Sequence, residues 1–448
     1  MMNILLVGGT GVLSTAVANE ALKVGIGVTM INRGNRMQLI PKGAHLIKAD
    51  KNDKSTIRAM LEGRRFDAVI DFLCYTDEEI TQSFSFYSGY TKQYFFISSC
   101  AVYDKTLGGV SSEDSPKVMP IWSYSVNKWK SEEHLMQLAR SSAVKYTVIR
   151  PAVTYGDTRI PYGVSPRYGY HWTLVARILS GKPLIRWNGG VNRCNMMRVE
   201  DFAVGVVGLI GNPKAYNEAF NICGDEAPSF NDVLDVMQKL TGREVTTVDV
   251  TSEFYAHELP ERAGEILGGR SVDGINSNDK IKRVVPAFRQ TIPLKEGVAM
   301  TYRAYKDNGY QMGIDWSFDG DCDRIIKKWC RTNKIDFAPY NLGFTDYLGN
   351  ATAADKRRYY MSLNKNRLDV RILKLGARGL RLSKRALKKL LSTARITPPP
   401  PNRNALTGVV ISKRRIIYCW HGGYRNWNSQ NIAAGSCSAA QQTYLKRF

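Results

Sequence analysis

The first 150 residues alternate short apolar runs with longer stretches in which apolar residues recur every three or four positions. The short runs have the length and the nearly continuous apolar character of strands that are buried on both faces of a parallel sheet. Strands that alternate with helical stretches predict an α/β fold with a doubly wound parallel sheet. The expected strands are residues 4–7, 28–31, 45–48, 69–74 and 94–97.

The pattern becomes mixed after about residue 150, which predicts a smaller C-terminal lobe. Helices are expected at residues 173–179 and 202–210, a strand at 220–222, and a helix that starts at Ser229 and Asp232 and ends at Gly242. The expected organisation is a first domain of residues 1–165, to which parts of 195–225 return, a lobe of residues 166–310, an aromatic extension of residues 311–355 that packs on the body, and a tail of residues 356–448.

The whole chain has a formal net charge of +23, and most of this charge lies in the tail. Residues 356–448 contain 21 Lys or Arg and one acidic residue, Asp369, whereas residues 1–355 contain 42 basic and 39 acidic residues. This break marks a boundary near Ala354. Residues 365–395 have the pattern of a basic amphipathic helix, which could contact an anionic membrane surface or nucleic acid. The alternative is an appendage that docks on its own body or is partly disordered.

Composition sets further limits on the class of protein. No stretch approaches the roughly 18 apolar residues of a transmembrane helix, and the start of the chain lacks the basic segment of a signal peptide. The eight cysteines form no Cys-x-x-Cys pair and the five histidines do not cluster. We therefore expect free thiols, no metal site and a cytoplasmic protein, which the tail could place at the periphery of a membrane.

A glycine-rich turn follows the first expected strand, with the spacing Gly8-x-x-Gly11-x-x-Ser14. Strand, glycine turn and helix in this order are typical of a dinucleotide site, because glycine lets the backbone approach a pyrophosphate and the helix N-terminus offers free N–H groups to it. Ser14 stands where a third glycine is usual, and it is small enough for close helix–strand packing. The alternative is a strand–turn–helix unit without a ligand.

The ends of the following strands would complete the cofactor site. Asn32 and Arg33 end the second strand, where an acidic residue usually holds the ribose hydroxyls and an arginine accommodates a 2′-phosphate, so NADP is favoured over NAD. Arg33 could also be an ordinary exposed loop charge. The expected cofactor-binding residues are Gly8, Thr10, Gly11, Val12, Leu13, Asn32, Arg33, Asp50, Phe72, Leu73, Tyr124, Lys128 and Pro151.

Tyr124 and Lys128 stand four positions apart, and Ser99 follows the strand-like run of residues 94–97. Residues at i and i+4 share one face of a helix. An adjacent ammonium favours the phenolate, and a serine hydroxyl can hold a substrate oxygen. Together they predict a catalytic set that moves a proton while hydride passes to or from a nicotinamide. The alternative is that Tyr124 and Lys128 are ordinary residues of a helix surface.

These motifs together resemble the extended short-chain dehydrogenase/reductase family, in particular its NAD-dependent epimerase/dehydratase group. The resemblance covers roughly residues 1–310 and implies a Rossmann domain, a smaller lobe that binds a nucleotide-sugar, and catalytic roles for the groups that match Ser99, Tyr124 and Lys128. Members often dimerise, so a homodimer is a further expectation. The matching segments are residues 8–11, 97–103, 124–128, 150–156, 198–201 and 220–224.

Departures from the family pattern narrow the expected activity. Sugar-nucleotide dehydratases of the family carry Thr-Asp-Glu where this chain has Ser99-Cys100-Ala101. Dehydration needs an acid and a base there, so a nucleotide-sugar epimerase or reductase fits better. Arg193 resembles the family's pyrophosphate-binding arginine with the register off by about one residue. The expected substrate pocket lies around Tyr155, Tyr168, Arg193 and Arg198, a choice that follows from the assignment of the lobe.

An RNA-binding function on the same fold is the alternative. Chloroplast stem-loop-binding relatives of the family motivate it, together with the strand end at Asn32 and Arg33 and the basic tail. In this case the tail would contribute to binding, with a steep salt dependence.

Overall fold

The structure is a computed structural model that describes residues 2–117, 121–309, 313–366, 408–412 and 415–419. The chain forms two compact units, Met1–Arg371 and Ile372–Phe448. The described part of the second unit is an antiparallel pair of strands, β12 (Gly408–Ser412) and β13 (Arg415–Cys419). The expected amphipathic helix of residues 365–395 lies, from residue 367 on, outside the described residues. All that follows concerns the first unit.

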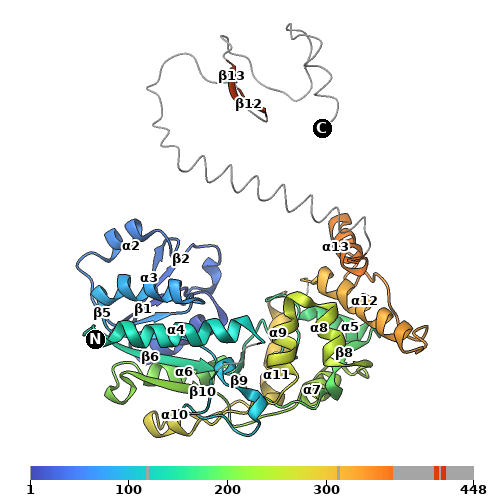
Figure 1. Ribbon diagram of the computed structural model, residues 1–448, viewed down its shortest axis with the longest axis horizontal. Helices are drawn as coiled ribbons and strands as arrows, with labels where there is room; N and C mark the ends of the chain where they lie inside the picture. The colour runs from blue at the N-terminus through green and yellow to red at the C-terminus, as the bar shows by residue number, and fades with distance from the viewer. Residues whose placement is uncertain (1, 118–120, 310–312, 367–407, 413–414, 420–448) are drawn as a thin grey trace. The chain divides into compact units, whose positions relative to one another are not determined.

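A seven-stranded parallel sheet forms the centre of the N-terminal domain (Figure 1), and it confirms the doubly wound arrangement that the sequence predicts. Strand order reverses beside β1, between β1 and β4, and such a switch point is where open α/β sheets bind ligands. The order across the sheet is β10 (Glu218–Ile222), β6 (Lys145–Pro151), β5 (Thr91–Ile97), β4 (Phe66–Asp71), β1 (Asn3–Val7), β2 (Gly27–Asn32) and β3 (His45–Lys48).

Helices cover both faces of this sheet because its strands bury side chains on both sides. In β1, Ile4 and Leu6 pack on one face and Leu5 and Val7 on the other. One face is covered by α1 (Val12–Lys23), α6 (Val199–Gly208) and α10 (Asp279–Val284), and the other by α2 (Lys54–Leu61), α3 (Asp77–Tyr87) and α4 (Ser123–Arg140). Strand β10 and helix α6, which both come from residues 195–225, thus belong to the sheet and to one of the helical layers that cover it.

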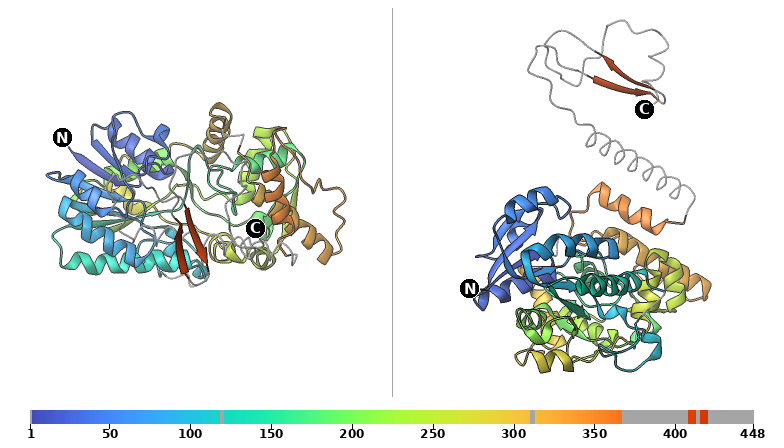
Figure 2. Two further views of the ribbon diagram at one scale, coloured as in Figure 1. Left: turned by 90° about the horizontal axis from the view of Figure 1, so that it is seen from above. Right: turned by 60° about the vertical axis from the view of Figure 1, so that its left-hand side comes forward.

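The C-terminal lobe is built from two short parallel strand pairs and a set of helices around one apolar core (Figures 1 and 2). The pairs are β7 (Val153–Tyr155) with β9 (Met196–Arg198) and β8 (Leu184–Trp187) with β11 (Thr247–Val250). The helices are α5 (Trp172–Leu179), α7 (Phe230–Thr241), α8 (Ser252–Glu258), α9 (Ala263–Glu265), α11 (Leu294–Asp307), α12 (Trp316–Thr332) and α13 (Ala353–Leu363).

The sequence signals of α7 operate as predicted. The Ser229 hydroxyl accepts a hydrogen bond from the Asp232 N–H, and the Asp232 carboxylate accepts one from the Ser229 N–H. Gly242 ends the helix with φ 63°, a left-handed conformation that favours glycine. These local contacts fix both ends of α7 independently of the core that it packs on.

The aromatic residues of the expected extension pack on the core of the lobe. Trp316 is buried, and its ring stacks on Phe344 and Tyr347 with centroids 5.0 and 5.7 Å away. The expected boundary near Ala354 lies at the start of α13, whose Tyr359 is fully buried. The compact unit therefore continues past this point, because an apolar face of α13 completes the core although the helix is rich in charge.

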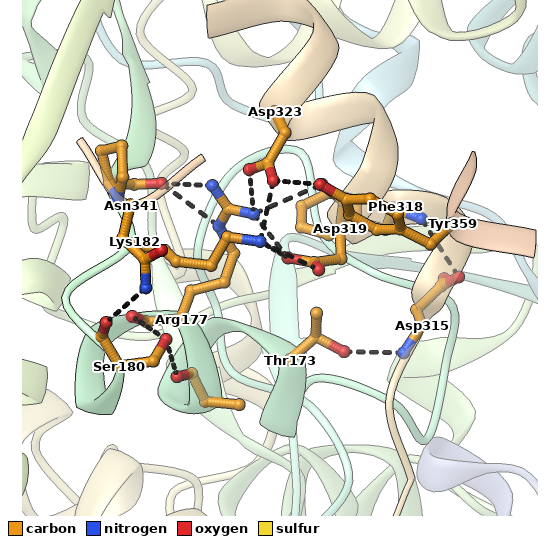
Figure 3. Close-up of polar contacts among 12 residues, drawn as sticks. Thr173, Arg177, Ser180, Lys182, Asp315, Phe318, Asp319, Asp323, Asn341 and Tyr359 are labelled. Carbon is orange, nitrogen blue, oxygen red and sulfur yellow. Dashed lines mark hydrogen bonds and ion pairs between the residues drawn. The ribbon is translucent and has the colours of Figure 1, made fainter. Parts of the chain in front are cut away.

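A buried cluster of four charges, which we call the ionic quartet, joins α12 to the rest of the lobe (Figure 3). Arg177 contacts Asp319 at 2.5 Å and Asp323 at 2.9 Å, and Lys182 contacts them at 3.2 and 2.8 Å. All four side chains are 0% exposed. Two cations and two carboxylates balance, which is the condition under which charges can be buried. Tyr359 donates a further hydrogen bond to Asp323 at 2.5 Å.

The described residues include no helix that is long and apolar enough to cross a membrane.

Candidate active site

The glycine turn lies between β1 and α1 and packs tightly on its surroundings. Gly8 has φ +92°, and a Cβ there would lie 2.5 Å from Leu73. At Gly9 a Cβ would lie 2.3 Å from the side chain of Met30. Glycine is therefore favoured at Gly8 by its positive φ and by close packing, and at Gly9 by the closeness of the Met30 side chain. The glycine turn therefore lies close to the strand ends at the switch point of the sheet.

Ser14 ties the glycine turn to the first turn of α1. Its hydroxyl donates to the Gly8 carbonyl at 2.9 Å and accepts from the Gly11 N–H at 2.9 Å. The side chain is 1% exposed. The serine that replaces the usual glycine thus fits the packing, as expected, and also fixes the turn. The N-terminal N–H groups of α1, together with its dipole, face the position that a pyrophosphate takes in this kind of site.

Asn32 carries an unsatisfied polar atom at the end of β2. Its Oδ1 accepts from the Gly34 N–H at 2.8 Å, whereas its Nδ2 is buried with no hydrogen-bond partner among the described residues. A buried donor without a partner costs free energy, and a ribose hydroxyl or a phosphate oxygen would satisfy it. The residues present therefore fit a dinucleotide, with the glycine turn for the pyrophosphate and Asn32 for the adenosine end.

The remaining expected cofactor residues lie along the same edge of the sheet. Arg33 and Asp50 are exposed, and Asp50 accepts a hydrogen bond from the Asn52 N–H at 3.0 Å. Phe72 continues β4 by donating its N–H to Val7 at 3.1 Å. Thr10, Val12 and Leu13 belong to the turn and the start of α1, Leu73 packs beside Gly8, and Pro151 ends β6.

Ser99 and Tyr124 are brought together at one cavity of about 320 Å³. Ser99 follows β5, and its hydroxyl accepts the Ala101 N–H at 3.1 Å, which fixes the orientation of the side chain. Tyr124 lies in the first turn of α4, and Trp122 packs against its ring with centroids 5.1 Å apart. Burial raises the pKa of Tyr124 to about 12, although hydrogen bonding to Ser99 and the charges of Arg159 and Arg270 oppose this shift.

Lys128 lies one helical turn beyond Tyr124 and is 3% exposed. Its ammonium donates to the carbonyls of Cys74 at 2.6 Å and Ile97 at 2.8 Å, and lies 5.9 Å from the centroid of the Tyr124 ring. Burial lowers the pKa of Lys128 to about 8. The sequence predicts that Lys128 lowers the pKa of Tyr124, and this account is incomplete. Burial of the phenol has the largest effect and raises this pKa, and the charges that lower it most are those of Arg159 and Arg270.

The cavity also contains residues that sequence motifs did not single out. Lys105, Arg159 and Arg270 bring positive charge to it, and Glu265 is the carboxylate among its lining residues. They come from segments far apart in the sequence, and only the folded lobe unites them. In the sequence each of these residues is an isolated charge, and an isolated charge of a cavity cannot be told from an ordinary surface charge until the packing is known.

Two glycines of the C-terminal lobe make room for Trp122. A Cβ on Gly264 would lie 2.7 Å from the Ile121 carbonyl, and one on Gly269 would lie 2.8 Å from the Trp122 ring. Residues Ile266–Arg270 form a π-helical turn, which the Ser271 N–H closes by donating to Ile266 at 2.9 Å. Such turns recur at functional sites, and this one places Arg270 at the cavity.

The expected substrate residues do not line this cavity. Arg198 is buried, with Asp157 at 2.8 Å and Glu200 at 2.6 Å, and it lies over the ring of Tyr155. Arg193 donates its Nε to the Ala227 carbonyl at 2.9 Å. Tyr168 is 43% exposed. Their roles as substrate ligands stay predictions, and the structure offers the lining residues as stronger candidates.

The fold and the glycine turn define a dinucleotide-binding domain of the extended short-chain dehydrogenase/reductase type. Residues 4–223, just under half of the chain, match the model of the NAD dependent epimerase/dehydratase family, and this segment belongs to that family. The family that the sequence resembles is thereby confirmed.

Individual relatives are more distant. A chloroplast stem-loop binding protein of 41 kDa from Arabidopsis thaliana is 28% identical over 256 residues, 53% of this chain and 63% of that protein. A UDP-glucose 4-epimerase from Vibrio cholerae is 28% identical over 130 residues, 29% of this chain and 37% of that protein. This chain therefore spans less than two thirds of the length of these two relatives.

Solved structures show the same fold. The UDP-glucose 4-epimerase of Thermotoga maritima, solved with UDP-glucose, superposes with a TM-score of 0.56 at 19% identity. The superposition covers 68% of this chain and 99% of that one. At this identity the likeness establishes the fold and leaves the activity to the site.

Proposed function

We propose that the protein is an NAD(P)-dependent nucleotide-sugar epimerase that acts through Ser99, Tyr124 and Lys128. The observation that carries the proposal is that Ser99 and Tyr124 line one cavity and that Lys128 lies one helical turn behind, at the edge of the sheet that bears the glycine turn. Family membership and the epimerases among its relatives support it. The alternative within the same chemistry is a reductase, which reduces a nucleotide-sugar without epimerising it.

Each residue has a distinct task in this proposal. Ser99, whose hydroxyl is oriented by the Ala101 N–H, holds the oxygen of the reacting carbon. Tyr124 holds or releases the proton on this oxygen. Because burial disfavours the phenolate, this proton transfer requires a neighbouring charge or hydrogen bond that favours it. Lys128 supplies the ammonium, held by two backbone carbonyls. A bound nicotinamide supplies the acceptor and donor of hydride.

We assign the cofactor to the glycine turn and Asn32. Gly8, Gly11 and the start of α1 would hold the pyrophosphate, and the free Nδ2 of Asn32 would reach the adenosine ribose. Asn32 carries no charge that repels a 2′-phosphate, and the exposed Arg33 could pair with one. These features favour NADP, with NAD as the alternative.

Replacement of Tyr124 by Phe tests the assignment. We expect turnover to fall by about 100- to 10,000-fold, the range for loss of a positioned acid or base, while the dissociation constant of the cofactor stays within about twofold. Native mass spectrometry of the purified protein first identifies the dinucleotide and any nucleotide-sugar that it retains, and chromatography of the sugar products then measures turnover.

A matched control separates chemistry from folding. Tyr146→Phe removes a hydroxyl from a half-buried tyrosine of β6 that lies outside the cavity lining, and it should leave turnover unchanged. Full turnover in the Tyr124→Phe variant would show that the phenol does not carry the proton.

RNA binding is a second candidate, which the similarity to the chloroplast stem-loop binding protein motivates. The site favours the enzyme, because Tyr124 lines the cavity with a raised pKa and Lys128 lies one helical turn behind with a lowered pKa, and perturbed pKa values cluster at reaction centres. Most of the basic tail lies outside the described residues. RNA affinity that is steeply salt-dependent and is lost on truncation after Ala354 would favour the RNA-binding function.

A further inference from the structure

The ammonium of Lys128 is buried and is held by neutral groups. It donates to the carbonyls of Cys74 and Ile97 at 2.6 and 2.8 Å, and the centroid of the Tyr75 ring lies 4.5 Å from it. The side chain is 3% exposed, so water contributes little to its solvation. Removing an ammonium from water costs free energy unless an opposite charge lies near it. A carboxylate beside these neutral partners would therefore keep Lys128 charged.

Burial lowers the pKa of Lys128 to about 8, and three carboxylates oppose this effect through their charge. In decreasing order of effect they are Asp71, Glu132 and Glu79. Glu132 is paired with Arg150 at 2.5 Å, and Glu79 with Lys51 at 2.6 Å. Asp71 forms no ion pair within the described ranges of the chain. Its charge is therefore the one that remains for Lys128.

Asp71 ends β4, and its side chain lies in the interior with only neutral donors around it. It is 2% exposed. The carboxylate accepts hydrogen bonds from the Leu73 N–H at 2.7 Å, from the Cys74 thiol and the Tyr94 hydroxyl at 3.2 Å each, and from the Ser83 hydroxyl. Burial raises the pKa of the Cys74 thiol, so this donor stays protonated. A buried carboxylate costs more free energy than the neutral amide that could accept the same Leu73 N–H, which favours a role for the charge itself.

The same carboxylate fixes the loop that follows β4. Leu73 and Cys74 both donate to Asp71, and from the other side Lys51 donates to the Leu73 carbonyl at 2.8 Å. The loop is thus bound through both its N–H and its C=O groups. This arrangement holds the Cys74 carbonyl in the direction of the Lys128 ammonium.

We propose that Asp71 is a positioning residue for Lys128: together with Lys51 it fixes the loop whose Cys74 carbonyl holds the ammonium, and its carboxylate keeps that ammonium charged. The inference rests on the proposed function, in which the charged Lys128 favours the phenolate of Tyr124. Asp71 acts on proton transfer through Lys128 and not on the substrate itself. Without its charge, Lys128 shifts towards the neutral amine and the phenolate loses support.

The pH dependence of turnover follows with a definite sign. Turnover requires the protonated Lys128, so kcat declines as the pH rises through the pKa of this residue. Removal of the Asp71 carboxylate lowers that pKa, so the decline moves to lower pH. The titratable groups that face the ammonium, from β4, its following loop, α3 and α4, are Asp71, Cys74, Tyr75, Glu79, Tyr124 and Glu132.

Asp71→Asn tests the proposal in the full-length protein, because it keeps the shape of the side chain and removes its charge. NMR titration of isotope-labelled lysine side chains, with Lys128→Arg to assign the signal, measures the pKa of Lys128 without turnover. We expect this pKa to fall by about 0.5–1 pH unit, less than for a directly contacting charge. The decline of kcat should move by the same amount, while KM for the nucleotide-sugar changes by less than about twofold.

Asp67→Asn is the matched control, because it makes the same change near the other end of β4. Its half-buried carboxylate accepts the Asn3 N–H at 2.8 Å, and the variant should titrate like the wild type. Lys51→Met covers the case in which Asp71→Asn does not fold, since the Lys51 side chain is 30% exposed. It removes the outer support of the loop, and we expect kcat to fall by about tenfold.

The outcomes separate this inference from the proposed function. An unchanged pKa of Lys128 in folded Asp71→Asn overturns the inference, even if kcat falls, because Asp71 would then only support the fold. If that variant does not fold, wild-type kcat in Lys51→Met overturns it. Persistent turnover of Tyr124→Phe refutes the proposed function, while the NMR titration still decides whether Asp71 acts on Lys128.

Discussion

The two halves of the candidate active site are built in different ways. The proposed cofactor half comes from strand ends and one helix within the first 151 residues, and its key contacts are local, such as Ser14 bonded to Gly8 and Gly11. The substrate half brings together Lys105, Arg159 and the segment around Arg270. The proposed cofactor half thus lies in short motifs, while the proposed substrate half depends on contacts that only the folded lobe creates.

The two lobes also bury charge differently. In the N-terminal domain, one pair joins Glu132 of α4 to Arg150 of β6 at 2.5 Å, and it also binds Ser98 and Tyr103. The C-terminal lobe uses the ionic quartet of Arg177, Lys182, Asp319 and Asp323 (Figure 3). The first network joins α4 to the neighbouring strands β5 and β6, whereas the quartet joins segments about 140 positions apart.

The largest expected effect comes from breaking the quartet. Asp323→Ala leaves Arg177 and Lys182 buried with one carboxylate, so we expect a loss of about 3–5 kcal/mol in the free energy of unfolding. Urea denaturation followed by circular dichroism measures it. The control is Asp249→Ala, which breaks an exposed pair with Arg186 and should cost at most about 1 kcal/mol. Equal losses in the two variants would show that the quartet does not hold the lobe.

A second expected effect concerns acid stability and His171, which is 2% exposed. Burial and the charge of Arg159 lower its pKa to about 3, while its Nδ1 accepts the Ile160 N–H at 3.1 Å. As the pH falls below about 6.5, the unfolded chain binds a proton that the folded chain refuses until about pH 3. The stability that neutral His171 contributes is therefore lost through this window, by a few kcal/mol at about 1.4 kcal/mol per pH unit.

His171→Gln should flatten this dependence. We expect the variant to lose less unfolding free energy than the wild type between pH 6.5 and pH 3, measured as denaturation midpoints at several pH values. His257→Gln is the control, because that side chain is 75% exposed, and its slope should match the wild type. Parallel curves for wild type and His171→Gln would show that another group causes the acid sensitivity.

The difference between local motifs and contacts that only the folded lobe creates also explains what could be predicted from the sequence. The strand runs, the glycine turn and the capping of α7 by Ser229 were predictable because local sequence determines them. Ser99 and Tyr124 could be placed together because the family order fixes which strand and helix carry them. Arg270 could not, since its position depends on a π-helical turn and on Trp122 packing against Gly264 and Gly269. For the same reason the prediction for Arg193 rests on a resemblance whose register is off by about one residue, and the prediction for Arg198 rests on the assignment of the lobe.

The smallest expected effect tests the cofactor half. Asn32→Asp places a carboxylate where the free Nδ2 now lies. A carboxylate accepts ribose hydroxyls but repels a 2′-phosphate. If the protein prefers NADP, the ratio of NADP to NAD affinity should fall by about tenfold or more, equivalent to about 1.4 kcal/mol.

Fluorescence titration of the reduced dinucleotides measures both affinities. Asn308→Asp adds the same charge at the end of α11, in the other lobe, and should leave the ratio unchanged. The comparison between the lobes makes this variant informative. Because the proposed cofactor half is local, one side chain should change the cofactor preference without changing the affinities for UDP-glucose and UDP-glucuronate. A change in those affinities as well would mean that the two halves of the site are coupled more closely than their separate origins in the chain suggest.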